Sequence, residues 1–446
     1  MTRLAATDVR VALAALALGL LTTRGPTTLD EALAIDRADA WAHGRASLST
    51  DPGDLWVPTR PTAGGLFYDE GDGLRMAAPP GLSLIALPLV AVPSWLRGEP
   101  YGAVSSALAR GGALEATLGP LRDDPRTVAF ALIGPVCFAL TLLYFLLAAR
   151  ALELSARARW LGAAALGLGS PLLVYAGTGW TQLPVTALLA FALWQVAERD
   201  RRPGLPATAL GIALGLAVLV RAECLLFAVP FGLATYRTEH RWRRSPSRSL
   251  FRLVLPLALA VGALVVVGLP SSDGGWSIAN LVVGGPGVLI SPRAGLLVYA
   301  PFALLAIPGA LALRAHPIFV VLAGVPALAL VVYGGWFDWP ASLAYGPRFL
   351  VPLLPLAALA FARGVDRWPA TGLLTIAAGF AVALPGTLIV HARIAEVESF
   401  WDPTPIRAFA QAPAVDWMIL ESTPLAVVLL LVAGLALVWE RVRKEA

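Results

Sequence analysis

VAFALIGPVCFALTLLYFLLAA, residues 128–149, is a run of 22 residues without a charged side chain. An α-helix of this length rises about 1.5 Å per residue and can cross a hydrocarbon core about 30 Å thick. Runs of similar character recur further along the chain, at Leu253–Leu269, Gly295–Leu313, Phe349–Ala362 and Pro424–Val438. The pattern predicts an all-α integral membrane protein that crosses the bilayer many times.

The composition agrees with this class. Hydrophobic residues make up 57% of the chain, charged residues only 14%, and the mean hydropathy is +0.72, which excludes an ordinary soluble domain. Both cysteines, Cys137 and Cys224, lie in apolar runs, where a thiol behaves as a small hydrophobic group. The sequence therefore offers neither a disulfide framework nor a cysteine metal site.

The positively charged residues indicate the orientation of the chain. They form four groups: Arg150, Arg157 and Arg159; Arg199, Arg201 and Arg202; Arg237, Arg241, Arg243, Arg244, Arg248 and Arg252; and Arg441, Arg443 and Lys444. By the positive-inside rule these groups face the cytoplasm. Residues 24–127 instead carry 13 Asp and Glu against 9 Arg, a balance that fits the outer face.

Counting crossings between these groups gives a topology. If Gly81–Leu96 crossed the membrane, Arg150–Arg159 would lie outside. We therefore interpret the proline-containing segment Pro79–Leu96 as an interfacial or re-entrant helix. About twelve spans follow, in a bacterial-type inner membrane, and both termini lie in the cytoplasm. They are expected near 9–23, 128–149, 160–175, 183–197, 206–220, 224–236, 253–270, 295–313, 317–333, 347–362, 369–390 and 424–439.

The predicted organisation is one polytopic membrane domain over residues 1–446. Residues 24–127 form a long extracytoplasmic acidic loop with interfacial helices, and residues 128–446 form the remaining transmembrane bundle. The first span, Val9–Thr23, lacks a small-x-small cleavage site and is interpreted as a retained helix. Arg221 and Glu223 interrupt an apolar run and are interpreted as an outer-face hinge, because a charge at mid-bilayer costs a few kcal/mol.

This topology brings several polar segments to the outer face. They are the acidic loop, the turn Gly177–Gln182, residues 271–294, the stretch from Gly334 to Arg348, and residues 391–423. Tryptophan stacks on sugar rings, arginine pairs with phosphate oxygens, and a carboxylate accepts a hydroxyl proton. Together they suggest a site for a sugar phosphate.

Several motifs in these segments resemble a known family. Asp30-Glu31 follows the first span, Ala42-His43-Gly44-Arg45 comes next, and Phe67-Tyr68 leads to Pro79-Pro80-Gly81-Leu82. Further on stand Ser291-Pro292-Arg293-Ala294-Gly295, Trp336-Phe337-Asp338-Trp339 and Tyr345-Gly346-Pro347-Arg348-Phe349. In order and topology they resemble GT-C superfamily membrane glycosyltransferases, the group that contains protein O-mannosyltransferases and lipid A aminoarabinose transferases.

The resemblance implies transfer of a sugar from a polyprenyl-phosphate donor on the extracytoplasmic face. It implies that Asp30 is the catalytic base, with Glu31 as the other candidate. Relatives often place a lysine before the Pro-Pro pair, where this chain has Ala78. We therefore expect the donor phosphate to contact arginines chosen from Arg221, Arg348, Arg293 and Arg75.

The same resemblance and the aromatic content suggest residues that contact the sugar or acceptor: Trp336, Trp339, Tyr345, Tyr68 and Gln182. Gln182 stands where many relatives have an acidic residue, so a site without a metal or other cofactor is expected. The expected partners are the polyprenyl-phosphate-sugar donor, a glycolipid, polysaccharide or protein acceptor, and the lipid bilayer, without nucleic acid.

Two other functions remain open on the sequence. A transporter or flippase of lipid-linked saccharides would also line a cavity with Arg and Trp, although the spans show no obvious inverted repeat. An O-antigen ligase or polymerase would share the outer-face arginines, but that class places its large outer loop late in the chain. The early position of the loop favours an inverting glycosyltransferase.

Overall fold

A computed structural model describes the positions of most of the chain. The described residues are 6–23, 29–46, 48, 67–69, 74–76, 79–102, 121, 124–202, 204–242, 244–267, 275–292, 294–337 and 345–388. Within them, nearly all regular structure is helical, as the sequence predicts.

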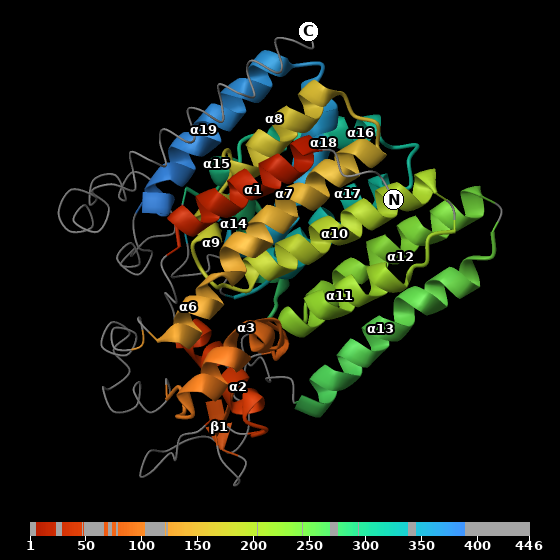
Figure 1. The fold of residues 1–446 in the computed structure, drawn as a ribbon. Helices are drawn as coiled ribbons and strands as arrows, with labels where there is room; N and C mark the ends of the chain where they lie inside the picture. The colour runs from red at the N-terminus through yellow and green to blue at the C-terminus, as the bar shows by residue number, and fades with distance from the viewer. Residues whose placement is uncertain are drawn as a thin grey trace.

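A bundle of long helices forms the body of the molecule (Figure 1). Its helices in chain order are α1 (Ala6–Leu21), α7 (Ile133–Ala151), α8 (Ala156–Gly167), α9 (Leu172–Ala176), α10 (Gln182–Arg201), α11 (Thr208–Val220), α12 (Cys224–Arg241), α13 (Pro246–Val267), α14 (Ile278–Ile290), α15 (Leu296–Tyr299), α16 (Ala303–Ala312), α17 (Phe319–Gly334), the 3-10 helix η2 (Arg348–Leu353), α18 (Leu354–Val365) and α19 (Pro369–Leu388). The central α10 packs against α7 on one side and α11 on the other, and its apolar side chains are almost all buried.

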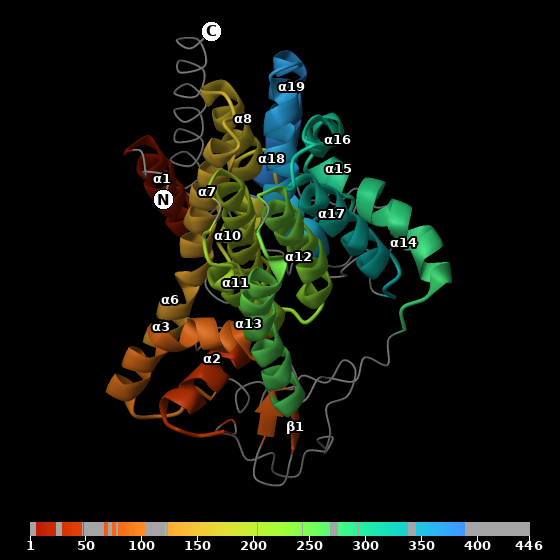
Figure 2. The same ribbon diagram turned by 90° about the vertical axis from the view of Figure 1, so that its right-hand side faces the viewer.

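A smaller assembly lies at one end of the bundle and is built from the segment between α1 and α7 (Figure 2). It contains α2 (Leu29–Ala42), α3 (Gly81–Arg97), α6 (Pro125–Ala131) and the antiparallel strands β1 (Phe67–Asp69) and β2 (Leu74–Met76), in which Tyr68 pairs with Arg75. Helix α3 packs mainly against α2 and α6, and it ends at Gly98, which adopts φ 70°. The N-terminus of α3 reaches the bundle, because Gly81 lies against the backbone of Leu219 and Val220 at the end of α11.

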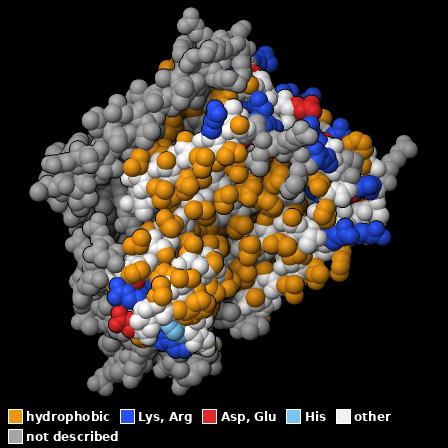
Figure 3. Space-filling model, viewed as in Figure 1, with side chains coloured by type: hydrophobic (Ala, Val, Ile, Leu, Met, Phe, Trp, Pro, Cys, Tyr) orange, Lys and Arg blue, Asp and Glu red, His pale blue; other side chains and the backbone are white. Residues whose placement is uncertain are grey.

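Charged and apolar side chains separate along the bundle. Arginine side chains gather at the end opposite the α2–α3 assembly, and a broad apolar surface lies between the two ends (Figure 3). Exposed apolar residues along α13 include Phe251, Val254, Leu255, Leu259 and Val265. At the arginine end, Arg150 pairs with Asp8 at 2.8 Å and Asp200 contacts both Arg241 and His316. This distribution suits a protein embedded in lipid.

Three helical segments of the described chain are long and apolar enough to cross a membrane. They are Pro125–Ala151, Pro246–Val265 and Arg348–Val365, and six further apolar helices are between 10 and 17 residues long. The sequence predicts about twelve spans, and eleven of the predicted positions coincide with described helices or helix pairs. The twelfth position, 424–439, lies outside the described residues, so the full count stays a prediction.

Helix α14 is a departure from the sequence-based topology, which treats residues 271–294 as an outer-face segment without a helix. The glycines and proline in this segment resemble helix breakers, but Pro286 is accommodated inside α14. A Cβ on Gly334 would lie only 2.8 Å from the Cα of Gly285, so α14 and α17 cross at close range. The glycines therefore serve helix packing in this segment rather than a turn.

The break expected at Arg221 and Glu223 is present. Helix α11 ends at Val220, and α12 begins at Cys224. The end of α11, directly before this break, lies beside the start of α3.

Candidate functional site

Glu31, near the start of α2, ties the α2–α3 assembly to the bundle. Its side chain is buried, with 1% of the residue exposed. One carboxylate oxygen accepts a hydrogen bond from the backbone N–H of Gly179 at 2.5 Å, and the other accepts from Trp180 Nε1 at 3.1 Å. Glu31 thus fixes α2 against the turn between α9 and α10.

Trp180 also contacts an arginine from a distant part of the chain. The guanidinium carbon of Arg348 lies 4.7 Å from the centroid of the Trp180 ring, within the range of a cation–π contact. Arg348 begins η2 directly after a turn in which Gly346 adopts φ 72°. A Cβ at Gly346 would lie 2.6 Å from the ring of Tyr299, so both its conformation and its surroundings require glycine.

Gln182 joins this arginine to a second one. The residue is 1% exposed and begins α10. With its amide oxygen toward the guanidinium groups, it accepts hydrogen bonds from Arg348 Nε at 3.0 Å and from Arg221 Nη1 at 3.3 Å. Two arginines that are 127 positions apart in the sequence therefore meet at one amide.

Arg221 is held by an acidic and aromatic surrounding. Its Nη2 and Nε lie 2.5 and 2.6 Å from Glu223 Oε1, which also accepts a hydrogen bond from Tyr333 Oη at 3.2 Å. The guanidinium carbon lies 5.7 Å from the ring centroid of Tyr333 and 5.4 Å from that of Phe349. Residues from the α9–α10 turn, the start of α10, the α11–α12 break, α17 and η2 thus form one connected group. We call it the arginine cluster: Trp180, Gln182, Arg221, Glu223, Tyr333, Arg348 and Phe349.

The surroundings of Glu223 favour its ionised form. Burial by itself raises the pKa of a carboxyl group, but the adjacent Arg221 guanidinium outweighs burial and brings the pKa of Glu223 below its ordinary value. The cluster therefore contains a carboxylate at neutral pH next to its two guanidinium groups.

The structure places the other predicted residues in different ways. Tyr345 is buried, its hydroxyl donates to the carbonyl of Val382 at 2.5 Å, and its own carbonyl accepts from Tyr175 Oη at 3.0 Å. Trp336 follows α17 and lies half-buried beside Phe337. Neither residue belongs to the arginine cluster, and their predicted contact with sugar remains a prediction.

Five predicted positions have side chains outside the described residues. Asp30 contributes its backbone to α2, and Tyr68 and Arg75 contribute theirs to the hairpin. Arg293 and Trp339 lie outside the described residues altogether. Their predicted roles therefore remain predictions, as does the absence of a metal requirement.

Sequence reasoning brings Arg221, Arg348, Gln182 and Glu31 to the outer face but does not identify the residues that connect them. The predicted set of site residues omits Trp180, Glu223, Tyr333 and Phe349, although Glu223 is expected with Arg221 in the outer-face hinge. Two of them carry a sequence signal: Trp180 ends the Gly-Thr-Gly-Trp turn before α10, and Glu223 belongs to an Arg-x-Glu break between two apolar helices. Tyr333 and Phe349 carry none, because aromatic residues at span ends are common.

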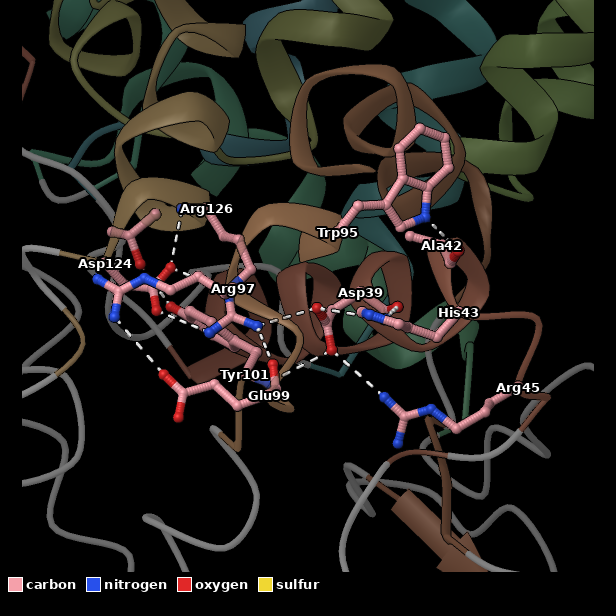
Figure 4. A network of polar contacts seen from close by, with 11 residues as sticks. Asp39, Ala42, His43, Arg45, Trp95, Arg97, Glu99, Tyr101, Asp124 and Arg126 are labelled. Carbon is pink, nitrogen blue, oxygen red and sulfur yellow. Dashed lines mark hydrogen bonds and ion pairs between the residues drawn. The ribbon is translucent and has the colours of Figure 1, made fainter. Parts of the chain in front are cut away.

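A second polar network lies within the α2–α3 assembly and is centred on Asp39 (Figure 4). Asp39 is fully buried and accepts hydrogen bonds from Arg126 Nη1 at 3.0 Å, Tyr101 N at 3.3 Å and Arg45 Nη2 at 3.4 Å. Arg126 also donates to both oxygens of Asp124 at 2.8 to 2.9 Å and to the carbonyl of Glu99 at 2.7 Å. We call this group, Asp39, Arg45, Glu99, Tyr101, Asp124 and Arg126, the Asp39 network; it joins α2, the segment after α3, and α6.

Comparisons with known proteins identify the fold. No protein-family model matches the sequence, and a search of curated proteins finds no match. Among solved structures, ArnT from Cupriavidus metallidurans bound to undecaprenyl phosphate is similar with a TM-score of 0.53 and 16% identity, over 98% of this chain and 73% of that one. The same protein in its apo state gives 0.49 and 19%, over 98% and 74%. The archaeal oligosaccharyltransferase AglB from Archaeoglobus fulgidus, in complex with an inhibitory peptide and a dolichol-phosphate, gives 0.46 and 12%, over 92% and 57%.

The first of these similarities shows that the chain shares its fold with that ArnT over most of its length. At this level of identity the similarity concerns the fold alone. The chemistry of the site must therefore be argued from this chain's own residues.

Proposed function

We propose that this protein is a membrane glycosyltransferase that moves a sugar from a polyprenyl-phosphate donor to an acceptor hydroxyl on the extracytoplasmic face. The observation that carries the proposal is the meeting of Arg221 and Arg348 at Gln182. Two guanidinium groups at the end of a lipid-embedded bundle suit a phosphate whose lipid tail lies among the helices. The similar ArnT structure is bound to undecaprenyl phosphate, which is the same class of ligand.

The arginine cluster is organised for anion binding. Guanidinium groups present their N–H donors in a plane and pair with phosphate oxygens bidentately. Gln182 contacts both groups and Trp180 contacts Arg348, and neither of these two side chains carries a charge. In the proposed reaction these arginines stabilise the negative charge that develops on the departing lipid phosphate.

Helix α2 supplies the proposed base. Both oxygens of Glu31 accept hydrogen bonds from fixed donors in the α9–α10 turn, so Glu31 is suited to hold α2 in place. Asp30 precedes it at the start of the helix and is our proposed base. Asp30 takes the proton of the acceptor hydroxyl, the oxygen attacks the anomeric carbon, and the bond from that carbon to the phosphate oxygen breaks with inversion.

The remaining parts of the proposal concern the surroundings of the reaction. The acceptor is a glycolipid, a polysaccharide or a protein, and the protein lies in a bacterial-type inner membrane with both termini in the cytoplasm. We propose that no divalent metal is required, which activity measured with and without a chelator tests directly.

Substitution of the two arginines tests phosphate binding. Arg348→Ala and Arg221→Ala should each weaken binding of polyprenyl phosphate to the purified protein by about 10- to 100-fold, since a hydrogen bond to a charged group contributes about 1.5–3 kcal/mol. Arg348→Lys should recover only part of this loss, because lysine lacks the bidentate geometry.

Arg363→Ala is the matched control, because Arg363 is an exposed residue near the C-terminal end of α18, which follows η2. It should bind polyprenyl phosphate as the unmodified protein does. If both cluster variants have the unfolding temperature of the unmodified protein and bind polyprenyl phosphate as tightly, the phosphate site does not lie in the arginine cluster. Binding without sugar transfer to any acceptor would instead favour a flippase of lipid-linked saccharides.

A further inference from the structure

Glu223 is an unexpected residue in a site for an anion. It lies at the break between α11 and α12, and its Oε1 is 2.5 Å from Arg221 Nη2. About a quarter of its side chain, 26%, remains exposed, so a ligand bound to the arginines would lie near a carboxylate. A negative charge here opposes phosphate binding, and it opposes a doubly charged phosphate more than a singly charged one.

Hydrogen bonds from two neighbouring residues hold this carboxylate in the site. Arg221 and Tyr333 both donate to Glu223 Oε1, and these contacts favour the charged form. Arg221 is thereby paired with a carboxylate of the protein at the same place where Gln182 joins it to Arg348.

The proposed reaction changes the charge of the lipid phosphate. The donor is a phosphodiester with one negative charge. Cleavage of the bond between the anomeric carbon and the phosphate oxygen leaves a phosphomonoester, whose second ionisation has a pKa of about 6. At neutral pH the product polyprenyl phosphate thus carries nearly one negative charge more than the donor did.

We propose that Glu223 sets the charge of the arginine cluster for the singly charged donor and promotes release of the doubly charged polyprenyl phosphate. This inference rests on the proposed function and adds a specificity-determining residue to it. Without Glu223 the two arginines would hold the dianion more tightly than the monoanion, because attraction grows with the charge of the ligand. With Glu223 present, repulsion reduces that preference and promotes release of the spent lipid carrier.

Two ligands that differ by one charge test the proposal. Polyprenyl phosphate is the dianion at pH 8, and its monomethyl ester is a monoanion with the same tail and without a sugar. Binding of both to the purified full-length protein in detergent gives an affinity ratio, which is insensitive to a general loss of fold. The unmodified protein should prefer the phosphate only slightly over the methyl ester.

In Glu223→Gln the ratio should shift toward the phosphate by about tenfold, because the amide keeps the shape and removes the repulsion. Glu223→Asp keeps the charge and should keep the ratio of the unmodified protein. In steady-state transfer, Glu223→Gln should lower kcat and increase inhibition by added polyprenyl phosphate.

Each contrary result has a definite meaning. An equal change in both affinities in Glu223→Gln would overturn the proposal and leave Glu223 as a support for Arg221. A strong preference of the unmodified protein for the phosphate would overturn it even if no Glu223 variant folds. A failure of the proposed function gives a different result. If the arginine cluster does not bind the phosphate, Arg348→Ala should bind both ligands as tightly as the unmodified protein does.

Discussion

The Asp39 network and the arginine cluster both contain buried arginines, but they differ in how their charges are matched. In the Asp39 network, Arg126 lies between the carboxylates of Asp39 and Asp124, and its remaining donor capacity reaches the carbonyl of Glu99. In the arginine cluster, Arg221 and Arg348 share a neutral amide, and Glu223 is the carboxylate that contacts Arg221. The charges of the first arrangement are matched within the protein, whereas we propose that the second binds an external anion as well.

The largest expected effect breaks the Asp39 network. Asp39→Ala leaves Arg126 buried, with 2% of its side chain exposed, and without one of its carboxylates. Removing one partner of a buried ion pair typically costs about 3–5 kcal/mol, so thermal unfolding in detergent should occur at a markedly lower temperature.

Glu99→Ala is the control in the same segment. The Glu99 side chain is 66% exposed and lies 3.5 Å from Arg97, and its carbonyl contact with Arg126 survives the substitution. Such surface pairs contribute at most about 1 kcal/mol, so the unfolding temperature should hardly change. Equal unfolding temperatures for Asp39→Ala and Glu99→Ala would show that the Asp39 network does not stabilise the fold.

The second prediction concerns catalysis beside the arginine cluster and should leave stability intact. Asp30→Asn preserves size and hydrogen bonding but removes the base, so the rate of sugar transfer should fall by about 100-fold or more while donor binding is retained. Glu31→Gln should reduce transfer less, since Glu31 positions α2 and does not take the proton. The reverse order would assign the base to Glu31, and full activity in the double variant would exclude a base at either position.

The smallest expected effect is a pH dependence within the Asp39 network. Burial raises the pKa of Asp124, but the hydrogen bonds from Arg126 outweigh burial and place the pKa below its ordinary value. A lowered carboxyl pKa stabilises the fold above the unfolded-state value of about 4, and this contribution is lost as the pH falls through the folded-state pKa.

The unfolding temperature of Asp124→Asn should therefore be lower than that of the unmodified protein at pH 7, and the difference should shrink toward pH 3. Asp124 also accepts from the backbone N–H of Arg126 at the start of α6, and asparagine can keep this cap. A difference that stays constant over this pH range would assign the effect to packing rather than to charge.

The sequence predicts some parts of these two regions and not others. It places Arg221 and Arg348 at the ends of apolar segments, because a charged residue cannot remain at mid-bilayer without great cost. It cannot show that both meet at Gln182, since this depends on how α10, α11 and η2 pack. Asp39 and Arg126 are 87 positions apart, and no periodic pattern links them. Helix α14 is missed for a related reason. In the sequence alone Gly285 resembles a turn residue, and its role in a close helix crossing is visible only in the structure, where Gly334 lies beside it.

The turn before α10 has a consequence for how sequences of this kind can diverge. At Gly177 a Cβ would lie 2.1 Å from the carbonyl oxygen of Thr22, and at Gly179 one would lie 2.1 Å from the ring of Phe130. Neither glycine carries a functional group, yet mutation to any other residue would displace Trp180 and Gln182 together. We therefore expect Gly177 and Gly179 to be as invariant as the two arginines among sequences that carry the same site. A distant relative in which lysine replaces one arginine would still be recognisable by these two glycines.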